Sequence, residues 1–149
     1  MELVQYEMTP KLLDALYTES MILADEARSY FDRDPVAGGL EPAAAVAFSC
    51  ESLKVTTRLM HSIAWLLNQK AYRAGELSQA DIYSESRDLG YAPASDHFLA
   101  ERFPAEAREI IRASEELYFR LQRINAGLRS QNSEMPEPIR LRQQLMQAF

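Results

Sequence analysis

The run Glu51-Ser-Leu-Lys-Val-Thr-Thr-Arg-Leu-Met-His-Ser-Ile-Ala-Trp-Leu-Leu67 lies in the middle of a long apolar-rich stretch, residues 42–74, around which the chain is organised. One row of residues returns at alternating spacings of four and three, which is typical of a helix seam facing a neighbour. That row is Val46, Cys50, Leu53, Thr57, Met60, Ala64, Leu67 and Ala71. A second row beside it is Phe48, Ser52, Val55, Leu59, Ile63 and Leu66. Together they exceed the roughly 100° of apolar surface that one neighbour needs, so we expect this helix to pack on two partners.

The ends of this central helix are marked in the sequence. Pro42 suits a first helical position because it lacks an N–H and has a preset φ. Gly75 can adopt the left-handed conformation that ends a helix. We therefore expect a helix over about 42–74.

Two further long helices are predicted, at residues 9–34 and 104–130. The first begins with Thr9 as N-cap and Pro10 in the first turn. Its apolar stripe is Leu13, Leu16, Ser20, Leu23, Ala27 and Tyr30, and that of the last helix is Ile110, Ser114, Leu117, Leu121, Ile124 and Leu128. The Gly- and Pro-rich segment 34–42 breaks the first helix from the second and is short enough to form an antiparallel hairpin.

The connection at residues 75–103 is acidic and irregular. Ser78 with Asp81 resembles a capping box for a short helix to about Asp88. The connection holds six acids against Arg87 and Arg102, whereas the central helix is net +3. We expect the connection to fold back along the central helix, with charge orienting the packing rather than driving it.

The sequence thus predicts an all-α fold. It is a three-helix bundle of long antiparallel helices, with a short extra helix in the connection before the last long helix. The bundle takes up residues 1–130, and residues 131–149 form a C-terminal tail that is linker-like and then amphipathic.

Composition excludes several classes of protein. The net charge of −6, with dispersed basic residues, disfavours nucleic-acid binding, which needs a clustered basic footprint. No apolar run reaches the ~18 residues of a membrane span, and the N-terminus lacks the pattern of a signal peptide. The single cysteine, Cys50, falls on the seam, where a buried small apolar side chain is expected. These features are typical of a cytoplasmic protein.

No catalytic, cofactor or metal site is predicted. His61 and His97 are the only histidines, and neither has a second ligand at helical spacing, so both are expected to be surface residues. Gly38-Gly39 lacks the Lys and Ser or Thr of a phosphate-binding turn. The carboxylates belong to outer faces and to the connection, with no apolar surroundings to shift their pKa values apart.

One face of the central helix stands out. Projection at 100° per residue places Arg58, His61, Trp65 and Tyr72 opposite the seam, where solvent is expected. A large aromatic side chain is normally covered, so we expect something to lie on Trp65. Two interpretations are open: the connection or the tail covers this face, or the face binds a partner or a second copy.

The run from Glu51 to Ser78 resembles the alphaproteobacterial RcdA family, also called DUF1465. The matching features are Thr56-Thr-Arg-Leu-Met60, Trp65-Leu-Leu67 and Gly75-Glu76, together with Leu16-Tyr17 and Glu26-Ala-Arg-Ser-Tyr-Phe-Asp32 in the first helix. The resemblance covers about two-thirds of the chain and is structural rather than catalytic.

The resemblance implies a dimeric three-helix bundle that regulates degradation of CtrA. Members of the family are adaptors of the ClpXP protease, which they join when it is primed by CpdR and to which they deliver cell-cycle substrates. The tail is suited to such contacts through Leu141, Leu145, Met146 and Phe149. Two alternatives stay open: a bundle that binds a small ligand or metal, with or without enzymatic activity, and a purely structural dimer.

Overall fold

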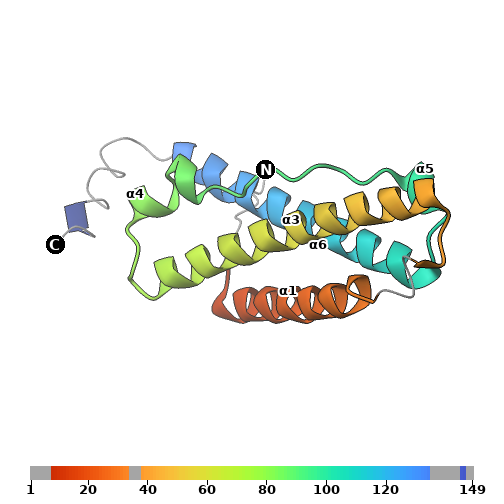
Figure 1. Cartoon of the computed structure of the whole chain (residues 1–149). Helices are drawn as coiled ribbons and strands as arrows, with labels where there is room; N and C mark the ends of the chain where they lie inside the picture. Colours follow the sequence, from red (N-terminus) through yellow and green to blue (C-terminus); the bar gives the residue numbers. More distant parts are fainter. Residues whose placement is uncertain (1–7, 34–37, 135–144, 147–149) are drawn as a thin grey trace, which may run out of the picture.

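Three long helices form the body of the molecule in a computed structural model, which describes residues 8–33, 38–134 and 145–146. They are α1 (Pro10–Phe31), α3 (Pro42–Arg73) and α6 (Ala105–Glu134). Between α3 and α6 lie the short helix α4 (Gln79–Ile82), the 3-10 turn η1 (Glu85–Arg87) and the short helix α5 (His97–Ala100). The described residues contain no strand, and the predicted all-α bundle is confirmed (Figure 1).

Local signals fix the helix ends much as predicted. Thr9 Oγ1 accepts a hydrogen bond from the Leu12 N–H at 3.1 Å and caps α1. The capping box of Ser78 and Asp81 is present and opens α4, although α4 ends at Ile82 rather than near Asp88. Gly75 has φ +80°, the left-handed conformation that follows the end of α3.

The directions of the long helices differ from the prediction. α1 runs antiparallel to α3, since Asp14 near the start of α1 pairs with Lys70 near the end of α3 at 3.1 Å. α3 and α6, however, run in the same direction, because Arg58 bonds to Ser114 and, further along, Trp65 bonds to Asn125. The prediction of antiparallel helices was therefore wrong for α3 and α6.

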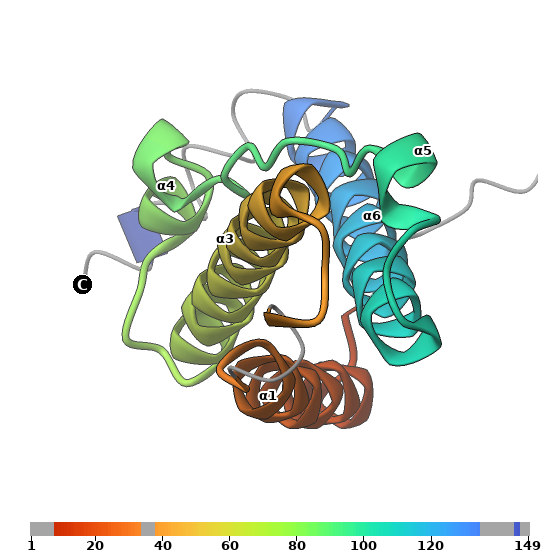
Figure 2. The same cartoon turned by 45° about the vertical axis from the view of Figure 1, so that its right-hand side comes forward.

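The connection explains the parallel pair. We call residues 83–96 the strap. It runs back over α3 and α6 on the side away from α1 (Figures 1 and 2). Its contacts pass from the end of α3 towards its beginning: Arg87 donates to Asn68 Oδ1 at 2.8 Å, and the Asp96 N–H donates to Glu51 Oε1 at 3.1 Å. The chain therefore returns to the end where α3 begins before α6 starts, and the prediction that this connection folds back along α3 is confirmed.

The predicted buried stripes of two helices are found in the core. All six stripe residues of α1 are buried. In α6, Ile110, Ser114, Leu117 and Leu121 are buried, while Ile124 and Leu128 are half-buried and pack against the core. At one end the rings of Phe48 and Phe103 meet edge to face, 5.3 Å apart. Among the described residues no helix is both long and apolar enough to cross a membrane.

The rotation of α3 corrects the sequence prediction. The seam expected to be buried faces outward, and Cys50 on it is exposed. The buried face is centred instead on Val55, and it includes four members of the second row: Phe48, Val55, Leu59 and Leu66. This face takes the interior because α1, α6 and the strap surround it, and because it carries Trp65 and Phe48, the larger apolar side chains.

Two adjacent leucines of α3 test this rotation. Leu66 is 0% exposed and Leu67 is 47% exposed. Leu66→Ala leaves a cavity and is expected to lower the free energy of unfolding by about 2–5 kcal/mol. Leu67→Ala, measured in dilute protein to minimise contacts between copies, is expected to change it by less than about 1 kcal/mol. Urea denaturation followed by circular dichroism measures both; equal losses would contradict the observed rotation.

Candidate interaction surfaces

The inward polar face of α3 is used to hold the strap. Arg58 is 1% exposed, and its guanidinium donates to Ser114 Oγ of α6 at 3.0 Å. The same group donates to the Pro93 carbonyl oxygen at 3.2 Å and to the Ser95 hydroxyl. Burial lowers the pKa of Arg58 below its usual value. Nearby acidic groups, of which Glu115 has the largest effect, raise this pKa, but by less than burial lowers it. Arg58 therefore joins α3, the strap and α6 at one point.

Glu51 lies about two helical turns before Arg58 on α3 and attaches the strap to α3 at a second point. Its carboxylate is 2% exposed and accepts from Lys54 Nζ at 2.9 Å and from the Asp96 N–H at 3.1 Å. Burial by itself raises the pKa of this carboxyl, but the hydrogen bonds from Ser95, Lys54 and the Asp96 N–H together lower it more. The pKa of Glu51 consequently lies below its usual value, and the ionised form stabilises the fold.

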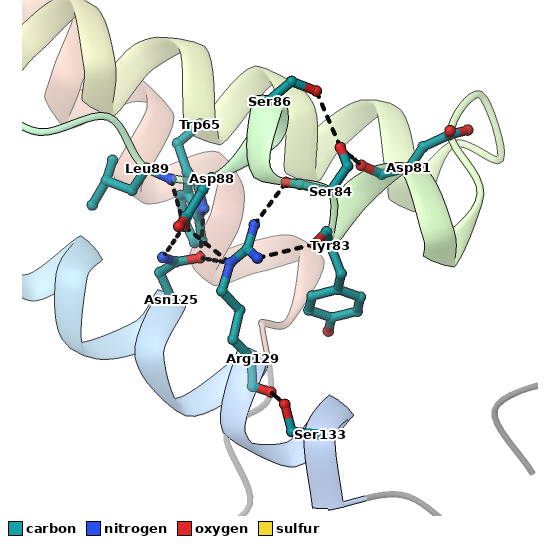
Figure 3. Close-up of polar contacts among 10 residues, drawn as sticks. All are labelled: Trp65, Asp81, Tyr83, Ser84, Ser86, Asp88, Leu89, Asn125, Arg129 and Ser133. Carbon is teal, nitrogen blue, oxygen red and sulfur yellow. Dashed lines mark hydrogen bonds and ion pairs between the residues drawn. The ribbon is translucent and has the colours of Figure 1, made fainter. Parts of the chain in front are cut away.

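Trp65 is covered by a polar network between the strap and α6 (Figure 3). The indole N–H donates to Asn125 Oδ1 at 3.0 Å, and the Asn125 amide donates to Asp88 Oδ1 at 2.7 Å. Arg129 pairs with Asp88 at 2.9 Å and donates to the carbonyl oxygens of Tyr83 and Ser84. Trp65 is 2% exposed, because the strap is fastened above it on both sides.

These contacts decide between the two interpretations of the face that carries Arg58, His61, Trp65 and Tyr72. The strap of the same chain lies across this face. The structure therefore agrees with the interpretation in which the connection, and not a partner, covers Trp65. Arg58 and Trp65 are buried and offer a partner no surface, which corrects their assignment as partner contacts. His61 and Tyr72 are half-buried.

Gly90 of the strap lies directly against His61. A Cβ at position 90 would come within 2.7 Å of the His61 ring, so any side chain there would displace the ring or the strap. His97, the other histidine, is exposed, and its Nε2 lies 2.7 Å from Glu115 Oε1. Within the described ranges no group of three or more His, Cys, Asp or Glu side chains is placed to hold a metal ion.

The outward face of α3 is an exposed apolar surface that the sequence prediction placed inside. We call its eight residues the outer row: Val46, Cys50, Leu53, Thr57, Met60, Ala64, Leu67 and Ala71. Its four large side chains are between 47% and 67% exposed. Six members are exposed and two are half-buried, and none is charged. The spacing by fours and threes predicted a seam that packs on a neighbouring helix of the bundle, but this row of α3 faces outward.

One groove between the long helices adjoins the outer row, and another lies away from it. A groove of about 390 Å³ between α1 and α3 has Leu53 and Met60 of the outer row in its wall, so it continues that row sideways. A larger groove of about 680 Å³ lies along α1 and reaches Ala113 of α6, and it is lined by apolar side chains including Ile22 and Leu23 and by carboxylates including Glu26.

Two aromatic side chains on the connection are also exposed, and the sequence analysis did not single them out. Tyr91 on the strap is 82% exposed and Phe98 on α5 is 74% exposed. Of the four tail residues predicted to bind partners, Leu145 and Met146 are exposed, while Leu141 and Phe149 lie outside the described residues. Aromatic side chains left in solvent are typical of protein-contact surfaces.

These features define an all-α helical bundle whose inward polar groups secure its own strap and which exposes apolar side chains on α3, on the connection and on α1. The chain belongs to the family described as "Protein of unknown function (DUF1465)", whose model matches residues 4–149. No curated protein and no solved structure matches the chain.

Replacement of Arg58 is expected to release the strap. Arg58→Met keeps length and apolar contact but leaves the acceptors on Pro93, Ser95 and Ser114 unpaired, so we expect a loss of about 2–4 kcal/mol in the free energy of unfolding. Hydrogen exchange measured by mass spectrometry should speed up most in residues 92–97. Arg112→Met, at an exposed arginine that pairs only with Glu109 and Glu116 of its own helix, is the matched control and should change little.

Glu51 is expected to make stability depend on pH in the acid range. Because the folded-state pKa of Glu51 lies below the unfolded value of about 4.3, its contribution is complete above that pH and is lost as pH falls through the folded-state pKa. Glu51→Gln removes this contribution. The stability advantage of the wild type over Glu51→Gln, measured by urea denaturation between pH 3 and 7, should therefore shrink below about pH 4. A constant difference would rule out this role for the carboxylate.

Proposed function

We propose that this protein is a non-enzymatic adaptor of ClpXP-dependent proteolysis in cell-cycle control, acting as a homodimer in the cytoplasm. The observation that carries the proposal is the outer row, a continuous uncharged surface on a helix whose opposite face is fully used in packing. Membership of DUF1465 and the resemblance of residues 51–78 to the RcdA family support it. The partners it implies are protease primed by a CpdR-like regulator and the substrates to be degraded.

An adaptor that is also a homodimer needs a surface for its second copy and other surfaces for the protease and the substrate, and the exposed apolar side chains of this chain fall into separate sets that suit these uses. The outer row lies on α3, whereas Tyr91 and Phe98 lie on the strap and on α5. Tethering a weakly bound substrate beside the protease raises its local concentration, and no active site is needed for that effect. We assign Tyr91 and Phe98, with Leu145 and Met146 of the tail, to contacts with the protease or its substrates.

A small-ligand-binding bundle is the second candidate. The groove between α1 and α6 favours it, because about 680 Å³ lies within the usual size of ligand pockets. Both acidic and apolar side chains line that groove, so a cationic apolar compound is the kind of ligand it would take. The third candidate, a purely structural dimer, requires only the outer row.

Reconstituted degradation separates these candidates. ClpXP, a CpdR-like regulator and a fluorescent cell-cycle substrate are mixed with or without this protein. The adaptor proposal expects faster substrate loss when the protein is added, and it expects most of that acceleration to disappear in the double variant Tyr91→Ser, Phe98→Ser. Both side chains are exposed, so the variant should keep the wild-type circular dichroism spectrum and melting temperature.

Ile22→Ser provides the control, because it removes an exposed apolar side chain from α1 rather than from the strap or α5 and should leave the acceleration unchanged. If the wild-type protein has no effect under conditions where the regulator binds the protease, the adaptor proposal is wrong. The ligand-binding and structural candidates would then remain.

A further inference from the structure

We propose that two copies of this chain pair through the outer row of α3, with the two α3 helices antiparallel about a two-fold axis. This inference rests on the homodimer in the proposed function and names its interface and geometry. The outer row spans residues 46–71, about 37 Å of helix at 1.5 Å per residue. Its spacing by fours and threes is the pattern by which one helix contacts another along its length.

The absence of charge on the outer row suits pairing with a second copy of the chain. In a two-fold interface the same patch meets itself, so a charged patch must carry its own complementary charges, whereas an uncharged patch needs none. No member of the outer row is charged, although the whole chain carries a net charge of −6. The only acid within α3, Glu51, is turned into the interior, and Lys54 beside it is half-buried and paired with Glu51. The outer row can therefore meet its own copy without electrostatic repulsion.

The sizes of the side chains give the direction of pairing. The four large members, Val46, Leu53, Met60 and Leu67, recur every seven residues. The four small members, Cys50, Thr57, Ala64 and Ala71, recur every seven residues between them. A parallel pair in register would stack large on large and small on small, which leaves uneven layers. An antiparallel pair sets the large positions of one helix against the small positions of the other, as interdigitated packing requires.

Full overlap of the two rows also fixes the register. With the two-fold axis at the centre of the row, Thr57 faces Met60 of the partner subunit, and Leu53 faces Ala64 of the partner subunit. Towards the ends, Cys50 faces Leu67 of the partner subunit and Val46 faces Ala71 of the partner subunit. Each layer then holds one large and one small residue, and the groove between α1 and α3, walled by Leu53 and Met60, gives the edge of the interface further apolar surface.

Light scattering and a charge substitution test the interface. The full-length wild type should be a dimer at micromolar concentration. Leu53→Glu would bury an unpaired charge against Ala64 of the partner subunit and should raise the dimer dissociation constant at least about 100-fold. Leu53 is 67% exposed in the single chain, so circular dichroism should show an unchanged fold. Ile22→Glu, 63% exposed on α1, is the matched control and should remain a dimer.

Spin labels test the direction. In Cys50→Ser, Ser49→Cys, one label sits beside the outer row of each subunit. The antiparallel pair places the two labels about 30 Å apart along the axis, whereas a parallel pair places them about 10–15 Å apart. Double electron–electron resonance measures the longer distance, and line broadening in the continuous-wave spectrum reports the shorter one.

The outcomes separate this inference from the proposed function. A dimer that survives Leu53→Glu, or one with the shorter label distance, overturns the interface and leaves the homodimer in place. A monomer throughout the micromolar range overturns both the pairing and the homodimer. The adaptor role is scored independently by the degradation assay with the wild-type chain, whichever of these results is obtained.

Discussion

The buried guanidinium of Arg58 is the constraint on which the rest of the arrangement depends. A buried cation needs acceptors around it, and these come from the strap, through Pro93 and Ser95, and from α6, through Ser114. Meeting that need fastens the strap across the middle of α3, and Asn68 and Glu51 hold it on either side of Arg58. The parallel course of α6 follows, since the chain has been carried back to the starting end of α3 before α6 begins. A polar requirement inside the bundle thus sets its topology.

Features governed by neighbours in the sequence were predictable. The stripe of α1 from Leu13 to Tyr30 is buried throughout, and Thr9, Gly75 and the capping box at Ser78 act where the sequence places them. The rotation of α3 was not predictable, because both of its faces carry apolar residues at helical spacing. The choice between them depends on partners of Arg58 and Glu51 that lie 35 or more residues away in the sequence. The spacing of apolar residues along a helix gives no information on polar contacts with residues far away in the sequence.

The candidate surfaces, like the fold, could be predicted from the sequence only in part. The sequence drew attention to Trp65 as a residue that something must cover, and the strap covers it. It did not distinguish a seam that faces the core from one that faces outward, because the two have identical spacing. The exposure of Tyr91 and Phe98 depends on how the strap is laid across the bundle, which no short motif encodes. The sequence patterns therefore identified which segments are helices. They were less reliable in showing which side of a helix packs against the rest of the chain.

The parallel course of α3 and α6 also gives the molecule an electrical axis. The peptide dipoles of these two helices add, and antiparallel α1 offsets only one of them. The side chains at the ends match this field: Glu106 lies in the first turn of α6, and Lys70 and Arg73 lie in the last turn of α3. Their formal charges oppose the helix ends that they adjoin, which reduces the field at each end. At each end of the parallel pair one helix thus has a side chain of the opposing sign, while the first turn of α3 has no acid and the last turn of α6 has no base, so the dipoles of the pair are offset only in part.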